Sequence, residues 1–146
     1  MDIKNIVKDL AYKHGTHDPF ALCKSLNILV LFRNLESVRG IYFYDLRKRI
    51  IYINYNLASY LKRQVAAHEL GHAILHKNQN TFFCDNQTYM NTNKIEIEAD
   101  TFAAELLIDD DQLLHLNGYS IDQISKSFGV QKRLVEYKIQ NIHKLR

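Results

Sequence analysis

One segment, RQVAAHELGHAILH at residues 63–76, constrains the fold of this chain more than any other. Its His68 and His72 are four residues apart, a spacing that on an α-helix sets two side chains about 40° apart and one turn along the axis. Both imidazoles can then reach one metal ion. Glu69 lies about 100° around the helix from His68, within reach of a water molecule at that ion without being a ligand. The pattern HExxH therefore predicts a helix that carries a metal site.

The alternative interpretation of this segment is an ordinary amphipathic helix with surface or core histidines. That interpretation does not account for the glutamate beside His68 or for the apolar neighbours Ala66 and Leu70. A third histidine, His76, extends the series by one more turn. Eight residues of helix rise about 12 Å, which is too far for His68 and His76 to share one ion. We therefore expect no ligand at His76.

A second helix, predicted over residues 94–107, offers the third ligand. Glu96 and Asp100 are four residues apart and share one face, where alanines would allow a close approach to the first helix. Glu98 points about 200° away from Glu96 around this helix. We therefore expect Glu96 to be the metal ligand, and Asp100 to accept a hydrogen bond from the outer nitrogen of a liganding histidine.

Hydrophobic periodicity and turn signals predict the remaining elements. Apolar residues recur at helical spacing near both ends of the chain, while runs rich in Tyr, Ile and Phe indicate strands. An Asn- and Thr-rich stretch between the two ligand helices indicates a loop. The predicted elements are helices at 3–10 and from Asp18, a strand at 28–32, a hairpin at 40–56, a helix at 57–76, a loop at 77–93, a short helix at 112–116, a helix from Ser120 to Gly129 and a last helix at 133–145.

Together these elements predict an α+β fold, in which a small mixed or antiparallel sheet packs on the histidine-bearing helix and further helices include a C-terminal helical pair. We expect one domain over residues 1–146, because the chain has a single proline and no Gly/Ser-rich or Pro-rich linker. The longest purely aliphatic or aromatic run, at 28–32, is far shorter than the roughly 20 residues of a membrane span. The N-terminal segment lacks the apolar core of a secretory signal, so we expect a cytoplasmic protein without a membrane partner.

The paired motifs carry a family resemblance. HELGHAILH, followed after a loop by E-x-E-A-D-x-F-A-A-E-L-L and preceded by a hairpin ending in IIYIN, resembles the ImmA/IrrE family of small zincin-type metallopeptidases over most of the chain. The resemblance implies a zinc-dependent endopeptidase, often carried by phages and other mobile elements, that cleaves a helix-turn-helix repressor. It places the zinc ligands at His68, His72 and Glu96 and the catalytic glutamate at Glu69. One departure, Ile108-Asp109 where members usually have Met-Pro, lies at a helix end and not at the metal.

Two parts of the expected catalytic machinery stay open. An edge strand of the sheet would hold an extended substrate by strand addition, and we expect either 40–44 or 50–54 to be that edge. A group that stabilises the oxyanion is also needed. Tyr89, His76 and His115 are candidates, although each is more typical of a structural role.

Two other functions compete with a peptidase. In the first, a non-catalytic module binds a repressor and the metal only holds the fold, but a purely structural site needs no general base such as Glu69. In the second, the helix-turn-helix-like tail at 117–146 binds DNA through Lys132, Arg133 and Lys138. The net charge of +3 neither requires nor excludes an anionic partner. Because basic residues are few, we expect the tail to complete the peptidase domain instead.

Overall fold

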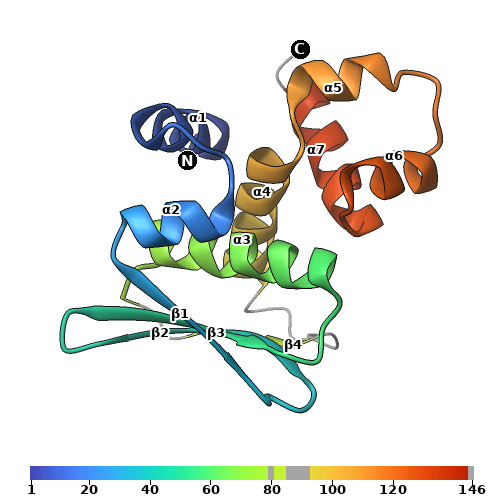
Figure 1. Ribbon diagram of the computed structural model, residues 1–146. Coiled ribbons are helices and arrows are strands. Elements are labelled where there is room, and N and C mark those ends of the chain that lie inside the picture. Colours follow the sequence, from blue (N-terminus) through green and yellow to red (C-terminus); the bar gives the residue numbers. More distant parts are fainter. Residues whose placement is uncertain (79–80, 85–92, 145–146) are drawn as a thin grey trace.

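The computed structural model describes residues 1–78, 81–84 and 93–144 and arranges them as an α+β fold, as predicted (Figure 1). Seven helices and one four-stranded sheet are formed by this part of the chain. None of the helices found there is both long and apolar enough to span a membrane. The elements are α1 (Ile3–His14), α2 (Pro19–Ser25), β1 (Ile28–Arg33), β2 (Val38–Asp45), β3 (Lys48–Asn54), α3 (Ser59–Leu75), β4 (Thr81–Cys84), α4 (Asn93–Leu107), α5 (Asp110–His115), α6 (Ile121–Phe128) and α7 (Lys132–Lys144).

The sheet is mixed, with the strand order β1-β3-β2-β4. The predicted strand and hairpin are confirmed: β1 pairs parallel with β3, and β2 pairs antiparallel with β3. The prediction of a continuous loop over 77–93 is wrong for residues 81–84, which form β4 against β2. A four-residue strand inside a polar stretch has too little periodicity to be seen in the sequence, because its pairing with β2 is a tertiary contact.

The strand order also corrects the expected substrate edge. Residues 40–44 belong to β2 and residues 50–54 to β3, and both strands lie inside the sheet. The prediction that one of them is an edge is therefore wrong, because β1 adds to β3 on one side and β4 adds to β2 on the other. Within the residues that the structure describes, the two edge strands are β1 and β4.

Helix α3 is the centre of the fold. Helices cover one face of the sheet, and α3 lies across that face with α4 behind it (Figure 1). Two glycines allow this close packing. A Cβ atom on Gly40 of β2 would lie 2.5 Å from Val65 Cγ1, and a Cβ atom on Gly71 would lie 3.1 Å from Phe102 Cβ and 3.2 Å from Ala99 Cα. As the alanines of its inward face predict, α4 approaches α3 closely, and α3 is fixed between the sheet and α4.

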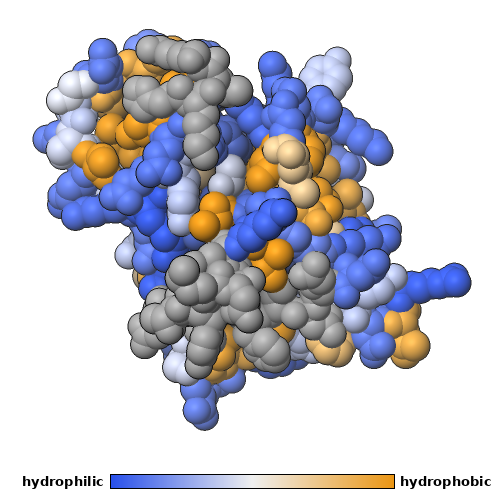
Figure 2. All heavy atoms as spheres, turned by 180° about the vertical axis from the view of Figure 1, so that it is seen from behind, coloured by the Kyte–Doolittle hydropathy of each residue, from blue (hydrophilic) through white to orange (hydrophobic). Residues whose placement is uncertain are grey.

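The C-terminal helical pair, α6 and α7, packs against this centre through α4. As predicted, Ser120 and Gln123 form a capping box at the start of α6, and Gly129 ends that helix in the left-handed region with φ of 66°. The view from behind shows hydrophilic residues over much of the surface, with hydrophobic side chains gathering over the region of α5–α7 (Figure 2).

The cations considered for DNA binding are mostly engaged within the fold. Arg133 pairs with Asp100, and Lys138 is buried against Glu105. Lys132 remains exposed and pairs with Asp122 on α6. Two of the three cations thus contact α4 from α7.

Candidate metal centre

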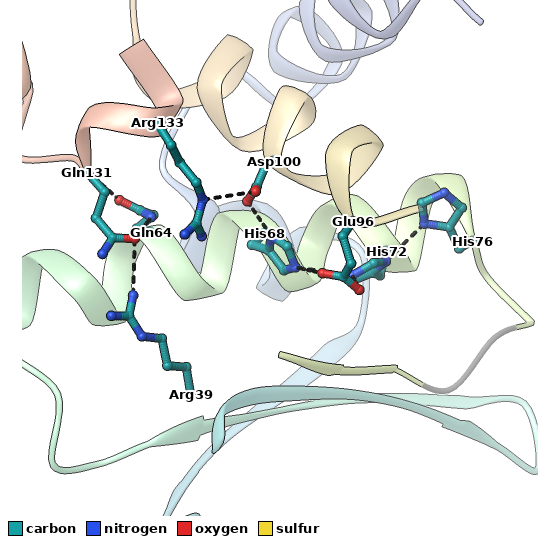
Figure 3. Close-up of polar contacts among 9 residues, drawn as sticks. All are labelled: Arg39, Gln64, His68, His72, His76, Glu96, Asp100, Gln131 and Arg133. Atoms are coloured by element: carbon teal, nitrogen blue, oxygen red, sulfur yellow. Dashed lines mark hydrogen bonds and ion pairs between the residues drawn. The ribbon is translucent and has the colours of Figure 1, made fainter. Parts of the chain in front are cut away.

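Three side chains from two helices converge at one point between α3 and α4 (Figure 3). His68 Nε2 and His72 Nε2 are 3.2 Å apart, and Glu96 places one carboxylate oxygen 2.9 Å from His68 Nε2 and the other 3.3 Å from His72 Nε2. Both histidines are fully buried, and Glu96 is partly buried, with 14% of its side chain exposed. The structure thus brings together the three residues that the sequence suggested as ligands.

The donor set and its spacing fit a zinc ion. Zinc takes imidazole nitrogen and carboxylate oxygen at about 2.0–2.2 Å in a tetrahedral arrangement, so two of its ligand atoms lie roughly 3.3 Å apart. The shortest separations among His68, His72 and Glu96 run from 2.9 to 3.3 Å, with a different Glu96 oxygen nearest to each histidine. One ligand atom from each of the three residues lies within 4.8 Å of the other two. Three protein ligands in a four-coordinate site leave one position for another molecule, as in catalytic rather than structural zinc sites.

Asp100 lies directly behind His68. The Nδ1 atom of His68 donates to Asp100 Oδ1 at 2.8 Å, the contact expected from the position of Asp100 one turn after Glu96. A proton held on Nδ1 leaves Nε2 with its lone pair directed at the convergence point. Burial alone would raise the pKa of Asp100, but the nearby His68 and Arg133 outweigh it and lower that pKa. Asp100 is therefore an anion that fixes the ring of His68.

A second pair of residues lies behind His72, and sequence reasoning missed its role. His72 Nδ1 and His76 Nδ1 are 2.9 Å apart, and His76 Nε2 lies 3.1 Å from Glu98 Oε1. His76 is outside the group of converging ligand atoms, in agreement with the expected distance. Glu98, predicted to lie on another side of α4 than Glu96, contacts His76, which is the C-cap residue of α3. The sequence signal that could have predicted this contact is the third histidine, His76, one helical turn after His72.

Electrostatics favour the ligating forms of two of the three residues. Burial lowers the pKa of His72 to about 4, so its ring is neutral at pH 7. Burial opposes ionisation of Glu96, but hydrogen bonds from His68 and His72 prevail and lower its pKa to about 2. For His68, burial lowers the pKa but Asp100 and Glu96 outweigh it and raise the pKa to about 10. A metal ion would therefore have to displace one proton, from His68.

Glu69 is also fully buried, beside the converging atoms but outside their group. Its carboxylate lies over the backbone of β2, where a Cβ atom on Gly40 would come within 3.1 Å of Glu69 Oε1. Glycine at position 40 therefore leaves the room that the glutamate side chain occupies between α3 and the sheet. The glycine on β2 therefore makes space for Glu69 on α3, the residue suggested as the general base.

The three candidates for oxyanion stabilisation differ in their surroundings. His76 is held by His72 and Glu98. His115 is exposed on α5, and its Nδ1 donates to the Asp111 carbonyl of its own helix at 2.7 Å. Tyr89 lies outside the residues that the structure describes. The two described candidates therefore have the structural contacts expected of each on its own.

Comparison with known proteins agrees with this geometry. Residues 23–140 match the model of peptidase family M78, the IrrE N-terminal-like domain. The chain is 38% identical over 139 residues to uncharacterized immunity region protein 2 of Bacillus phage phi105, an alignment that covers 93% of this chain and 88% of that one. It is 34% identical over 146 residues to the metallopeptidase ImmA of Bacillus subtilis (strain 168), covering 96% of this chain and 85% of ImmA. The chain therefore belongs to the ImmA/IrrE family of metallopeptidases.

Proposed function

We propose that this chain is a zinc-dependent endopeptidase that cleaves a helix-turn-helix repressor and thereby releases the genes of a phage or another mobile element. The observation that supports it best is the convergence of His68, His72 and Glu96 within 4.8 Å, with the buried Glu69 beside them. Family membership supports the peptidase activity, and a relative from the immunity region of a phage supports a repressor as the substrate.

In this proposal His68, His72 and Glu96 hold the zinc ion. When bound, zinc acts as a Lewis acid toward a substrate carbonyl and lowers the pKa of water toward 7. The protein supplies the ligand geometry: α3 presents both imidazoles from one face, and α4 presents the carboxylate across from them. Asp100 keeps the proton of His68 on Nδ1, so that the ring offers Nε2 to the metal.

Glu69 is the proposed general base. Its carboxylate would accept a proton from the attacking water and deliver it to the nitrogen of the leaving amine as the peptide C–N bond breaks. Its burial between α3 and β2 suits this role, because a base that is held in place loses little entropy as the reaction proceeds. Glu69 directly follows the ligand His68 on α3, so the base lies next to the metal site.

The outer edge of β4, beside which no further strand lies in the described part of the chain, is the proposed binding site for the substrate backbone. Strand addition at a sheet edge supplies main-chain hydrogen bonds to an extended peptide without reading its side chains. β4 follows α3 and precedes α4 in the chain, so it lies in the connection between the two ligand-bearing helices. The opposite edge, β1, has no such connection to them.

The rival function is a non-catalytic module that contains a metal and recognises a repressor or DNA by binding alone. A buried glutamate beside three ligands argues against it, because a structural metal needs no base and usually fills its fourth position with a protein ligand. The inward contacts of Arg133 and Lys138 argue against DNA binding through the tail. We further propose that residues 1–146 act as one metallopeptidase domain, in the cytoplasm where a repressor is found.

The test is co-expression with the helix-turn-helix repressor of the same mobile element. Mass spectrometry of the repressor should show two fragments from one cut with the native chain, and an intact repressor with Glu69→Gln. Binding of the repressor by Glu69→Gln without any cleavage by the native chain would favour the non-catalytic module. If the chain neither binds nor cleaves the repressor, that result excludes a repressor of this class as the partner.

A further inference from the structure

Helix α7 reaches the candidate metal centre through its first turn. Gln131, the residue before α7, donates its backbone N–H to Gln64 Oε1 at 2.8 Å, and Gln64 Nε2 donates to Gln131 Oε1 at the same distance. Gln64 is fully buried and lies one turn before His68 on α3. These reciprocal amide hydrogen bonds fix the start of α7 against the helix that carries both histidines (Figure 3).

Two residues further on, Arg133 contacts the back of the same site. Its Nε donates to Asp100 Oδ2 at 3.0 Å, while Asp100 Oδ1 accepts from His68 Nδ1 at 2.8 Å. Each oxygen of Asp100 thus has its own partner. A carboxylate held at both oxygens cannot rotate about its terminal bond without losing one contact, so the guanidinium sets the plane in which Asp100 meets His68.

We propose that Arg133 is a positioning residue of the metal site, which acts through Asp100 to hold the His68 ring with Nε2 directed at the ion. The inference rests on the proposed zinc site. It gives the C-terminal helical pair a role in metal binding, since the guanidinium comes from α7 whereas both residues on which it acts come from the central helices.

A purely structural role for Arg133, as an ion pair that attaches α7 to α4, is the alternative. Other contacts already make that attachment: Lys138 Nζ donates to Glu105 Oε2 at 2.6 Å in the interior, and Gln131 is held by Gln64. Arg133 is more exposed than Lys138, with 36% of its side chain accessible against 2%. The guanidinium end of the pair is partly open to solvent, which screens its charge, so the pair contributes less to folding than the buried Lys138–Glu105 pair.

The experiment measures zinc affinity by competition with a chelator, at one pH, on the full chain. Variants are Arg133→Ala, Asp100→Ala and the double variant, with Lys132→Ala as the control because it removes the adjacent cation, which pairs with Asp122 instead. Loss of a residue that orients a ligand typically weakens metal binding about 10- to 100-fold. We expect that range for Asp100→Ala, about tenfold for Arg133→Ala, and no change for Lys132→Ala.

The double variant decides between the two roles. If Arg133 acts through Asp100, removing it from the Asp100→Ala background changes zinc affinity no further. An equal loss in both backgrounds, or no loss in either, would overturn the proposal. Arg133→Lys should restore part of the affinity, because an ammonium keeps the charge but offers no planar donor to the carboxylate. Should Arg133→Ala fail to fold, Arg133→Gln replaces it.

A spectroscopic readout separates positioning from general stability. Nitrogen NMR of the zinc-loaded native chain should show the His68 ring with its proton on Nδ1. Arg133→Ala should broaden or shift this Nδ1–H signal and leave the His72 ring unchanged, whereas a structural loss would alter both rings alike and would contradict the proposal. Failure of the native chain to bind zinc would instead refute the proposed function on which the inference rests.

Discussion

Two polar clusters share helix α4, and they differ in the chemistry of the atoms that meet in each. The histidine cluster lies between α3 and α4, and the lysine cluster lies between α4, α5 and α7. Their central side chains are equally inaccessible: His72 is 0% exposed and Lys138 is 1% exposed. The histidine cluster consists of His68, His72 and Glu96, and the lysine cluster of Lys138, Glu105 and Asp110.

The two clusters differ in whether the side chains that meet there neutralise one another. In the lysine cluster an ammonium faces carboxylates, with Lys138 Nζ 2.6 Å from Glu105 Oε2, so opposite charges satisfy each other. In the histidine cluster, one ligand-type atom from each of two imidazoles and one carboxylate lies near one point, and a metal ion that displaces the proton of His68 would bind all three. Burial and charge are shared by both clusters. The chemistry of the converging atoms therefore separates a candidate site from a structural ion pair.

The largest effect should follow when the glutamate next to the histidine cluster is neutralised. Glu69→Gln keeps the shape of the side chain but removes the general base, so repressor cleavage should fall about 10²- to 10⁴-fold. Zinc affinity should stay the same, because Glu69 is outside the group of ligand atoms. Cleavage kinetics and chelator competition on the same preparation check both statements. Full activity in Glu69→Gln would show that another residue is the base.

The matching change in the lysine cluster should alter stability instead. Glu105→Gln leaves Lys138 buried with a weaker partner, and breaking a buried pair costs about 3–5 kcal/mol. We expect about 3 kcal/mol, the low end of that range, because Asp110 still contacts Lys138. Denaturant unfolding measures the loss. Zinc affinity of the folded Glu105→Gln chain should equal that of the native chain, and a parallel loss would mean that the clusters are coupled.

Lowering the pH from 7 to 5 should weaken one cluster only. Zinc must displace the proton of His68, whose pKa the neighbouring Asp100 raises against the effect of burial, so affinity should fall about tenfold per pH unit. Burial would raise the pKa of Asp110, but hydrogen bonds from Lys138 and Lys4 lower it. A depressed carboxyl pKa contributes stability above the unfolded value of about 3.9, and this is lost only as the pH falls through the folded value.

Two measurements test this pH difference. Chelator competition at both pH values, corrected for protonation of the chelator, should show about a 100-fold fall in zinc affinity over the two units. The difference in unfolding free energy between the native chain and Asp110→Asn should be equal at pH 7 and pH 5. A zinc affinity independent of pH would contradict the proton count at His68.

The smallest effect concerns the residue behind His72. His76→Phe keeps a ring at the C-cap of α3 but removes the nitrogen that meets His72 Nδ1 at 2.9 Å. Because partners of this kind orient a ligand without binding the metal, we expect zinc affinity to fall about tenfold. His115→Phe, which alters an exposed histidine on α5, is the control and should bind zinc as the native chain does. Equal affinities for both variants would limit His76 to a packing role.

The helices of the site were predictable because each has a local signal. HELGH fixes α3 by its histidine spacing, and the four-residue spacing of Glu96 and Asp100 places both on the face of α4 that meets it. The caps at Asp18, Ser120 and Gly129 likewise depend on neighbouring residues alone. Contacts between residues a few positions apart can be predicted from the sequence, because they produce periodicity and capping patterns.

The missed features depend on residues that are distant in the chain. β4 forms only because β2 offers it an edge, and the strand order then moves β2 and β3 into the interior of the sheet. The hydrogen bond from Arg133 to Asp100 joins positions 33 residues apart, and no local sequence pattern predicts it. In the sequence, Arg133 and Lys138 resemble the cations of a DNA-reading helix, and only packing shows that they turn inward.

The metal content of the purified chain tests the central claim most directly. Elemental analysis should find about one zinc per native chain, little or none in His72→Ala and Glu96→Ala, and the native amount in Glu105→Gln. Such a result would establish the histidine cluster as the metal site and leave the lysine cluster as a structural one. A native chain that contains no metal and takes up none when zinc is added would contradict the account, as would full zinc content in Glu96→Ala.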